Sequence, residues 1–255
     1  MTTPPAAELH GASRRAGDRI RHQRTDLAIR AAAVTAVIGP NGSGKSTLLG
    51  VLSGELVPTT GTAVIGGHDV RELSTIELAR RRALLTQETQ VSFGFTVADV
   101  VGWGRTPWRG SPSAADDTRA VDSALTAQGL NDLRDRPVTS LSGGERKRVH
   151  IARVIAQDTG LLLLDEADSD LDLVGRRSLD TLVAEQAARH RAAVVVTHDV
   201  TRISHLCDDV VLMRAGHVHA HGPRDEVLTE ELLSQAFGVP VRVLGDGGDV
   251  IIRIT

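Results

Sequence analysis

One short stretch, GPNGSGKST, combines the residue types needed to hold a triphosphate. Its glycines would let backbone N–H groups close around a phosphate without interference from a Cβ atom. A helix that begins near Lys45 would direct the positive end of its dipole at the same anion. The Lys45 ammonium could then reach the β- and γ-phosphates, and the Ser46 hydroxyl could hold Mg²⁺. The residues predicted to bind the nucleotide are Gly39, Pro40, Asn41, Gly42, Ser43, Gly44, Lys45, Ser46 and Thr47.

The alternative for this stretch is an ordinary strand–turn–helix whose glycines serve only the turn. The flanking residues argue against it, because an apolar run over residues 31–38 precedes the stretch. Leu48, Leu49 and Leu52 follow it at helical spacing. A buried strand, a glycine-rich loop and a helix are the context that a phosphate-binding loop requires.

Two adjacent carboxylates follow a second apolar run, Leu161–Leu164. Ligands bind at the carboxyl ends of parallel strands, so Asp165 is predicted to hold Mg²⁺, directly or through water, opposite Ser46. Glu166 could accept a proton from an attacking water. The alternative is that both acids only cap a following helix, but a phosphate loop requires a partner acid.

A second candidate anion site is the triplet Ser142, Gly143 and Gly144, which precedes a predicted helix. The N-terminus of a helix offers free N–H groups and a positive dipole end to an anion. Such a triplet alone is usually a turn with a cap. Its position downstream of a phosphate loop and shortly before Asp165 makes it a more specific signal.

The surrounding pattern predicts an α/β protein. Apolar runs at residues 83–86, 161–164, 194–196 and 210–213 alternate with helical patterns such as 174–190, which is typical of a parallel sheet covered on both faces. Other predicted elements are short antiparallel strands within 9–29, a strand at 62–65, a helix that Ser74 caps with Glu77 in a capping box, helices at 114–129, 144–157 and 225–236, and a strand at 250–254.

Composition excludes several classes of protein. The net charge of −3 and the aromatic content of 2% disfavour a nucleic-acid surface. The single cysteine, Cys207, excludes an internal disulfide and is interpreted as a small core residue in a cytosolic protein. We expect no signal segment and no transmembrane helix.

The basic run Arg80–Arg82 is expected to form a solvated face. His217, His219 and His221 could share one side of a strand, but a metal site there is disfavoured for lack of supporting ligands.

Together these motifs resemble the ATP-binding subunits of ABC transporters, from about residue 9 to residue 222. The stretch Gly39–Thr47 looks like the Walker A loop, Leu161–Glu166 like the Walker B segment, and Leu141–Glu145 like the signature motif. Gln87 matches the Q-loop glutamine, Ser169–Asp172 the D-loop, and His198 the switch histidine.

The resemblance implies a P-loop NTPase fold with a RecA-like parallel-sheet core, an antiparallel β subdomain and an α-helical insertion. Residues 1–255 would form a single ABC ATPase domain. Within it, 9–87 and 158–222 would form the nucleotide-binding core with its β subdomain. Residues 88–157 would form the helical subdomain with the signature motif, and 223–255 a C-terminal extension.

The resemblance also implies roles at the site, with ATP and Mg²⁺ as cofactors. Glu166 would be the base, His198 would contact the γ-phosphate, and Gln87 and Lys45 would complete the catalytic set. Ser46, Gln87 and Asp165 would bind the metal. Two copies would sandwich two ATP molecules head to tail, so that the triplet 142–144 of each copy contacts the partner's nucleotide. The D-loop residue Asp170 would also be among the nucleotide contacts.

Two positions depart from the family pattern. Ala16 stands where the family has an aromatic residue that stacks on adenine, so either Arg14 or Arg15 stacks instead or base selectivity is weak. Ala167 stands where a proline usually follows the catalytic glutamate, with little expected consequence.

Finer resemblance is to the ATPases of bacterial haem and iron–siderophore importers, carried by residues 52–56, 78–85 and 93–101. It implies a homodimer on the cytoplasmic face of the membrane, bound to permease subunits that work with a periplasmic or lipoprotein substrate-binding protein. The alternatives are an importer for cobalamin, a soluble ABC ATPase of another process, and a regulatory subunit with little turnover. The cobalamin importer remains an open alternative. A soluble ABC ATPase is disfavoured because the chain lacks the long coiled coil or second ATPase unit of that class. A regulatory subunit is disfavoured because Glu166 and His198 are both present.

Overall fold

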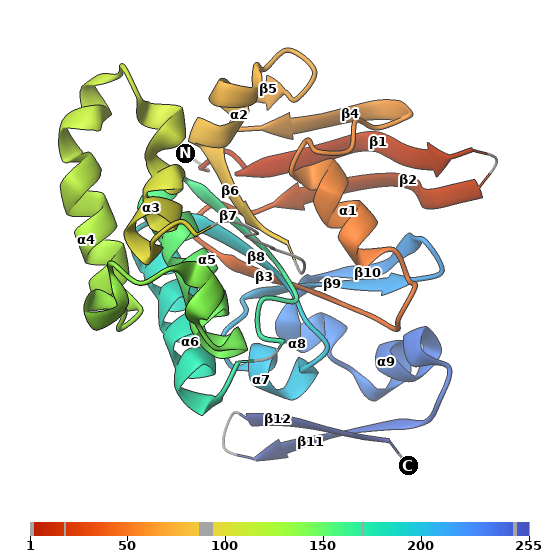
Figure 1. Ribbon diagram of the computed structural model, residues 1–255. Coiled ribbons are helices and arrows are strands. Elements are labelled where there is room, and N and C mark those ends of the chain that lie inside the picture. Colours follow the sequence, from red (N-terminus) through yellow and green to blue (C-terminus); the bar gives the residue numbers. More distant parts are fainter. Residues whose placement is uncertain (1–2, 18, 87–93, 170, 247–248, 255) are drawn as a thin grey trace.

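The computed structural model describes residues 3–17, 19–86, 94–169, 171–246 and 249–254 (Figure 1). Its main sheet has six strands in the order β10-β9-β3-β8-β7-β6. Five of them are parallel, and β10 is antiparallel to β9. This confirms the predicted parallel sheet. The strands are β3 (Val34–Ile38), β6 (Arg82–Leu85), β7 (Leu161–Asp165), β8 (Ala192–Val196), β9 (Asp209–Arg214) and β10 (His217–Pro223).

The central strands of this sheet are continuous apolar runs, as expected for strands that are buried on both faces. Every residue of β3 and β8 is buried. Val37, on one face of the sheet, packs in a core with Leu48 and Leu52 of α1 (Lys45–Leu52). Ile38, on the other face, belongs to a second core with Leu179 of α6 (Leu173–Ala188). The helix predicted at 174–190 is therefore confirmed as α6.

A second, four-stranded sheet covers α1 from the far side, in the order β2-β1-β4-β5 (Figure 1). The strands β1 (Ala7–Ala16) and β2 (Arg19–Ile29) form a long antiparallel pair with several register shifts. The expectation of short strands was wrong in length, because the shifts bend the pair without ending it. The strand predicted at 62–65 is confirmed as β4 (Thr60–Ile65), next to β5 (His68–Asp69).

The capping box predicted at Ser74 is confirmed at α2 (Thr75–Arg81). The Glu77 backbone N–H donates to the Ser74 hydroxyl at 3.3 Å, and the Ser74 N–H donates to Glu77 Oε2 at 2.9 Å. These reciprocal bonds satisfy two N–H groups that a helix N-terminus otherwise leaves free.

A helical region lies to the left in Figure 1 and has its own apolar core, which includes Val100, Leu125 and Val149. The predicted helices at 114–129 and 144–157 are confirmed as α4 (Asp117–Ala127) and α5 (Gly143–Gln157). The other elements of this region are α3 (Val97–Gly102) and the 3₁₀ helices η1 (Trp103–Trp108), η2 (Pro112–Asp116), η3 (Asn131–Leu133) and η4 (Val138–Ser140).

The C-terminal part follows α7 (Val200–Ser204) and β10. The helix predicted at 225–236 is two short helices, α8 (Arg224–Val227) and α9 (Glu230–Phe237). The break occurs because the Thr229 hydroxyl accepts the Leu232 N–H at 3.2 Å and begins a new helix. The strand predicted at 250–254 is confirmed as β12 (Asp249–Ile254), which pairs with β11 (Val241–Asp246).

The arginines at 80–82 do not form the solvated face that we expected. All three are half-buried, and their guanidinium groups donate to backbone carbonyls of Pro107, Glu77 and Ser53. Long side chains with fixed donors can cover apolar surface while satisfying buried carbonyls. The run is therefore structural.

The three alternating histidines also do not share one side of β10. His217 pairs with Arg214, whereas His221 pairs with Val211, because a register shift lies between Val218 and Ala220. Residues paired across a ladder share a face, so this shift puts His217 and His221 on opposite faces.

Cys207 is 4% exposed, and burial raises the pKa of its thiol to about 12, which confirms it as a core residue. Among the helices of the described ranges, none combines the length and the apolarity that crossing a bilayer requires.

The packing of the helical region depends on a close approach between Gly104 and the backbone of α5. A Cβ on this residue would lie 2.2 Å from the Arg153 carbonyl oxygen of α5, whereas a Cβ on Gly102 would meet nothing within 4 Å. We expect Gly104→Ala to lower the free energy of unfolding by about 1–3 kcal/mol through this clash. Gly102→Ala is the matched control and should be neutral or stabilising. Urea unfolding of both variants checks this, and equal stabilities would contradict it.

Candidate nucleotide-binding site

The predicted phosphate loop connects the end of β3 to the start of α1, with left-handed φ angles of 146° at Gly39 and 100° at Gly44. A Cβ on Gly39 would lie 2.3 Å from the Met213 carbonyl oxygen, and one on Gly44 would lie 3.1 Å from the Arg21 carbonyl oxygen. The loop is therefore held between the end of β9 and strand β2. Only glycine fits this backbone at both positions.

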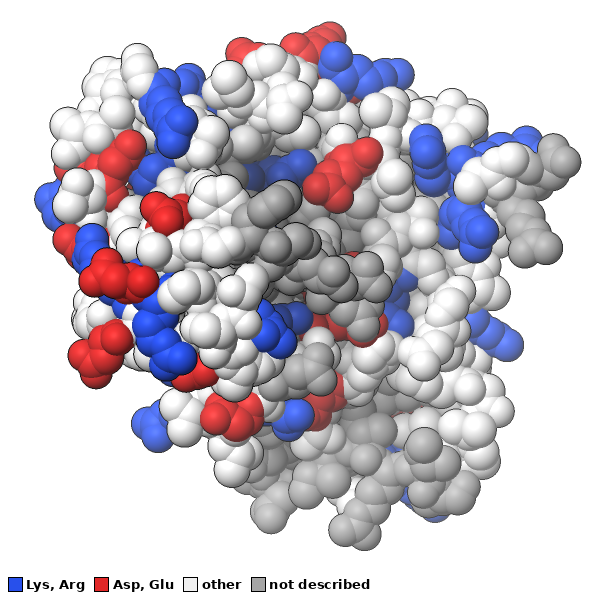
Figure 2. All heavy atoms as spheres, viewed as in Figure 1, with Lys and Arg blue, Asp and Glu red and all other residues white. Residues whose placement is uncertain are grey.

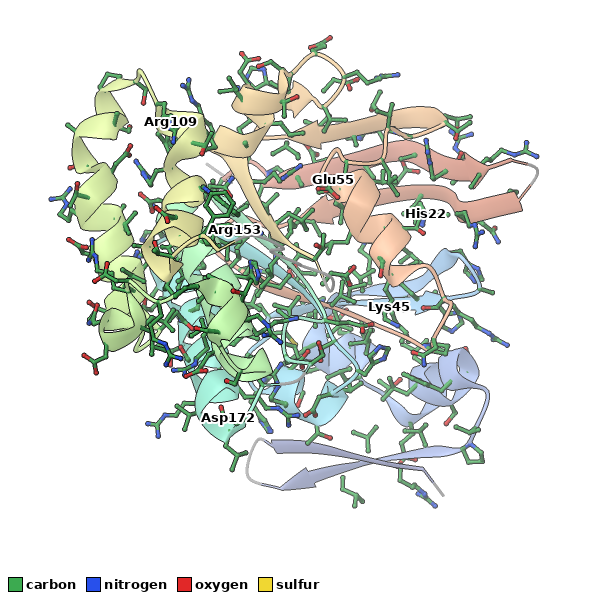
Figure 3. All side chains as sticks on the ribbon, in the orientation of Figure 1. His22, Lys45, Glu55, Arg109, Arg153 and Asp172 are labelled. Carbon is green, nitrogen blue, oxygen red and sulfur yellow. The ribbon has the colours of Figure 1, made fainter. Side chains whose placement is uncertain are left out.

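The Lys45 side chain curls back over this loop. It is 5% exposed, and its ammonium donates to the Gly39 and Pro40 carbonyls at 3.0 and 3.2 Å. Burial lowers its pKa, while the charges of Glu166 and Asp165 oppose that shift. Figure 3 labels Lys45 beside the first turn of α1. The carbonyls hold the ammonium at the place where the loop is predicted to receive phosphate oxygens.

Asp165 ends β7 beside the loop. Burial raises the pKa of its carboxyl, and the neighbouring Ser46 side chain opposes this shift. Its Oδ1 atom is buried and has no hydrogen-bond partner among the described residues. Mg²⁺ takes oxygen ligands from carboxylates and hydroxyls, so this unsatisfied oxygen next to a hydroxyl fits the predicted metal site.

Glu166 and His198 come together from the ends of adjacent strands. The Glu166 Oε1 and His198 Nε2 atoms are 2.6 Å apart. Glu166 has a left-handed φ of 48°, and its N–H donates to the Val196 carbonyl at 3.0 Å. In this pair a carboxylate oxygen can accept a hydrogen bond that the imidazole donates from Nε2. The two predicted catalytic side chains therefore lie within one hydrogen bond of each other.

The signature triplet is at a different place. Ser142 caps α5, and its hydroxyl and backbone N–H both lie close to Glu145 Oε2, at 2.7 and 2.8 Å. Ser142 and Gly143 are exposed, and Gly144 is half-buried. Within the described part of the chain, no hydrogen bond joins the triplet to residues 39–47. The chain alone does not bring its two candidate anion sites together.

Two predicted site residues, Gln87 and Asp170, lie outside the described residues, so their predicted roles remain predictions. The neighbouring D-loop residue Asp172 is exposed and caps α6 through a 2.7 Å bond from the Gly175 N–H (Figure 3).

Sequence reasoning missed a polar network behind the Glu166–His198 pair. The Asp168 carboxylate accepts hydrogen bonds from Thr197 Oγ1 at 2.8 Å and from the Arg202 guanidinium at 2.7 Å. Arg202 also pairs with Asp180 of α6. Asp168 lies three residues beyond the end of β7 and Arg202 six residues beyond the end of β8, and this spacing does not by itself reveal a pair.

Basic side chains gather at the right of the view in Figure 2, over the end of the hairpin of β1 and β2. Ala16, in the predicted adenine-stacking position, is exposed. The Arg14 guanidinium donates to the Val57 carbonyl at 2.7 Å and is thereby held against that carbonyl. Of the two arginines that could replace the missing ring, Arg15 is the exposed one.

Comparison with known proteins gives a consistent result. A family model described as "ABC transporter" matches residues 22–169. A hemin import ATP-binding protein from Rhodococcus jostii is 42% identical over 216 residues, which cover 85% of this chain and 74% of that protein. A cobalamin import ATP-binding protein from Halobacterium salinarum is 39% identical over 241 residues, 94% of this chain and 60% of that protein.

Solved structures share the fold. A chain of an inward-facing, metal-chelate type ABC transporter aligns with a TM-score of 0.80 and 25% identity over 98% of this chain and 97% of its own. An ATP-binding cassette in a dimeric post-hydrolysis state with ADP and phosphate aligns with a TM-score of 0.75 and 23% identity, covering 86% of this chain and 98% of its own.

The buried carboxylate of Asp165 gives a prediction on stability. Its raised pKa means that the unfolded chain releases this proton at lower pH than the folded protein does, so stability falls as the pH rises between the two pKa values. At pH 7 the ionised carboxylate is therefore unfavourable to the nucleotide-free fold. We expect Asp165→Asn to stabilise that fold by about 1 kcal/mol at pH 7.

Urea unfolding without nucleotide measures this effect, and the gain should shrink as the pH is lowered toward the ordinary pKa of aspartate. Asp158→Asn is the control, because Asp158 is exposed and paired with Arg191. An Asp165→Asn variant less stable than the parent at pH 7 would contradict the argument.

Proposed function

Because this chain belongs to the ABC transporter family, we propose that it is the ATP-hydrolysing subunit of a bacterial importer that energises uptake of haem or a ferric siderophore. The observation that carries the family is the match over residues 22–169, and the hemin-import relative at 42% identity supports the cargo class. The proposed nucleotide-binding core consists of residues 9–87 and 158–222. The proposed helical subdomain consists of residues 88–157, and the proposed C-terminal extension of residues 223–255.

In the proposed reaction, the loop 39–47 holds the triphosphate of ATP and Lys45 neutralises its β- and γ-phosphates. Ser46, Asp165 and Gln87 would hold Mg²⁺, which when bound would balance the phosphate charge. The Glu166 carboxylate accepts the proton of the attacking water. His198 donates a hydrogen bond from Nε2, first to Glu166 and then toward the γ-phosphate. The 2.6 Å separation of these two side chains supports the assignment.

We propose that the working form is a head-to-tail homodimer. The phosphate loop and the signature triplet, of which Ser142 and Gly143 are exposed, are not hydrogen-bonded to each other in the described structure, and this supports a site completed by a second copy. Ser142, Gly143 and Gly144 would then contact the partner's nucleotide, with Asp170 at the same interface. The likeness to a dimeric ATP-binding cassette with ADP and phosphate agrees with this arrangement.

We further propose peripheral attachment to the cytoplasmic face of the membrane through permease subunits, which would work with a substrate-binding protein. Phe95 and Trp103, 41% and 36% exposed, form an edge-to-face pair with ring centroids 5.0 Å apart on the helical region. Exposed aromatic pairs are favourable anchors for a partner protein. We assign this pair to the permease contact.

A cobalamin importer is the second candidate. The cobalamin-import relative, at 39% identity over 94% of this chain, favours it specifically. The ATPase residues do not distinguish the two cargos, because the cargo would pass through the permease.

Reconstituted transport tests the proposal. With its permease in lipid vesicles, the chain should drive ATP-dependent accumulation of haem, and Glu166→Gln should lower ATP turnover by about 100-fold or more because the base is lost. The variant should still bind ATP and should accumulate as an ATP-bound dimer, which size-exclusion chromatography detects. Glu185→Gln is the control, because Glu185 is exposed on α6.

Three outcomes separate the alternatives. Transport of cobalamin but not haem would reassign the cargo while keeping the ATPase. Parental turnover by Glu166→Gln would remove Glu166 as the base. Turnover of the isolated chain that no permease changes would favour a soluble ABC ATPase.

The missing adenine-stacking ring gives a separate prediction. With alanine at position 16, we expect ATP and GTP to bind with affinities within about tenfold of each other. Introducing a ring by Ala16→Tyr should tighten ATP binding by about fivefold or more, since base–aromatic stacking contributes about 1–3 kcal/mol. Nucleotide titration measures both, with Ala16→Leu as the control for bulk without a ring. A parental preference for ATP of a hundredfold would refute the weak-selectivity hypothesis.

A further inference from the structure

The loop that carries His198 is bonded on both sides of the histidine. Thr197, which is 0% exposed, donates from Oγ1 to Asp168 Oδ2 at 2.8 Å. The same hydroxyl accepts the Asp199 N–H at 3.1 Å. The backbone before and after His198 is therefore fixed to a carboxylate that belongs to the segment following Glu166.

Asp168 also faces Arg202 of α7. The guanidinium donates to the same Oδ2 atom at 2.7 Å, and its other end pairs with Asp180 on α6. The Arg202 and Asp168 side chains are 15% and 14% exposed, and the Arg202 Nε atom is buried without a partner in the described structure. Such a poorly hydrated cation needs both carboxylates, and loss of either would leave a buried charge uncompensated.

The Glu166 side of the pair is anchored from the same segment. The Ser169 hydroxyl, next to Asp168, donates to the Glu166 carbonyl at 2.8 Å. One short turn thus fixes the Glu166 backbone through Ser169 and the His198 loop through Asp168.

We propose that Arg202 is a positioning residue for ATP hydrolysis, which through Asp168 and Thr197 holds His198 within hydrogen-bond distance of Glu166. Arg202 touches neither of these side chains, so it acts through the geometry of the pair. The inference rests on the proposed ATPase function and adds a residue to it that no motif contains.

Small displacements of catalytic groups are expensive, because a shift of about 1 Å can lower a rate by a hundredfold. We expect Arg202→Met to lower kcat by about 10- to 100-fold and to change KM for ATP by less than about twofold. Arg202→Lys keeps the charge but places all its donors on one nitrogen, so it should recover part of kcat.

Coupling to His198 distinguishes positioning from a general loss of stability. If Arg202 acts by placing His198, then Arg202→Met should have less than about a twofold further effect on the residual kcat of His198→Ala. Arg105→Met is the matched control. Its guanidinium is similarly buried and pairs with Asp117 in the helical region, so its effect on kcat should be the same in both backgrounds.

Hydrogen exchange gives a readout that needs no turnover. Amides of residues 197–199 should exchange faster in Arg202→Met than in the parent, and unchanged exchange there in Arg105→Met would show that the effect is local. The inference is overturned if Arg202→Met costs the same factor with and without His198, or if exchange at 197–199 does not change. A parental chain that hydrolyses no ATP would instead refute the proposed function, and the exchange experiment would still decide the role of Arg202 in fixing this loop.

Discussion

The parallel order of β3, β8 and β7 is the constraint on which the site depends. Neighbouring parallel strands end at the same edge of a sheet, so the segments that follow them must meet. The phosphate loop follows β3, His198 follows β8, and Glu166 follows β7. Had any of these strands run in the opposite direction, one of the three groups would lie at the far edge. The apolar runs of the strands thus position polar chemistry that they do not contain.

Local signals in the sequence were sufficient wherever one short segment decides its own structure. The loop from Gly39, the capping box at Ser74, and the runs that form β3, β7 and β8 could be predicted because propensity and burial agree there. Expectations failed where distant residues decide. Arg80 and Arg82 donate to backbone carbonyls of other segments, and one register shift in β10 separates His217 from His221. The contact of Asp168 with Arg202 has the same character, since it joins the turn after β7 to helix α7.

The position of the signature triplet changes how the phosphate loop should be understood. Ser142 uses its own capping box to order the start of α5, so the N-terminus of this helix is organised without any nucleotide. Pre-ordered N–H groups lose little entropy when an anion arrives. The proposed dimer would therefore bring together two surfaces that are each already shaped, and ATP would supply the negative charge between them.

Two charged groups at the candidate site are buried, which is unfavourable for the charged form of each. The buried Lys45 ammonium donates to two backbone carbonyls. Asp165 leaves one buried carboxylate oxygen without a hydrogen-bond partner among the described residues. Both arrangements are unfavourable alone because burial disfavours the charged form of each group. A phosphate beside Lys45 and a cation beside Asp165 would relieve them together. Binding free energy is then linked to folding free energy, and the nucleotide that the chain is proposed to hydrolyse would also be a ligand that stabilises its fold.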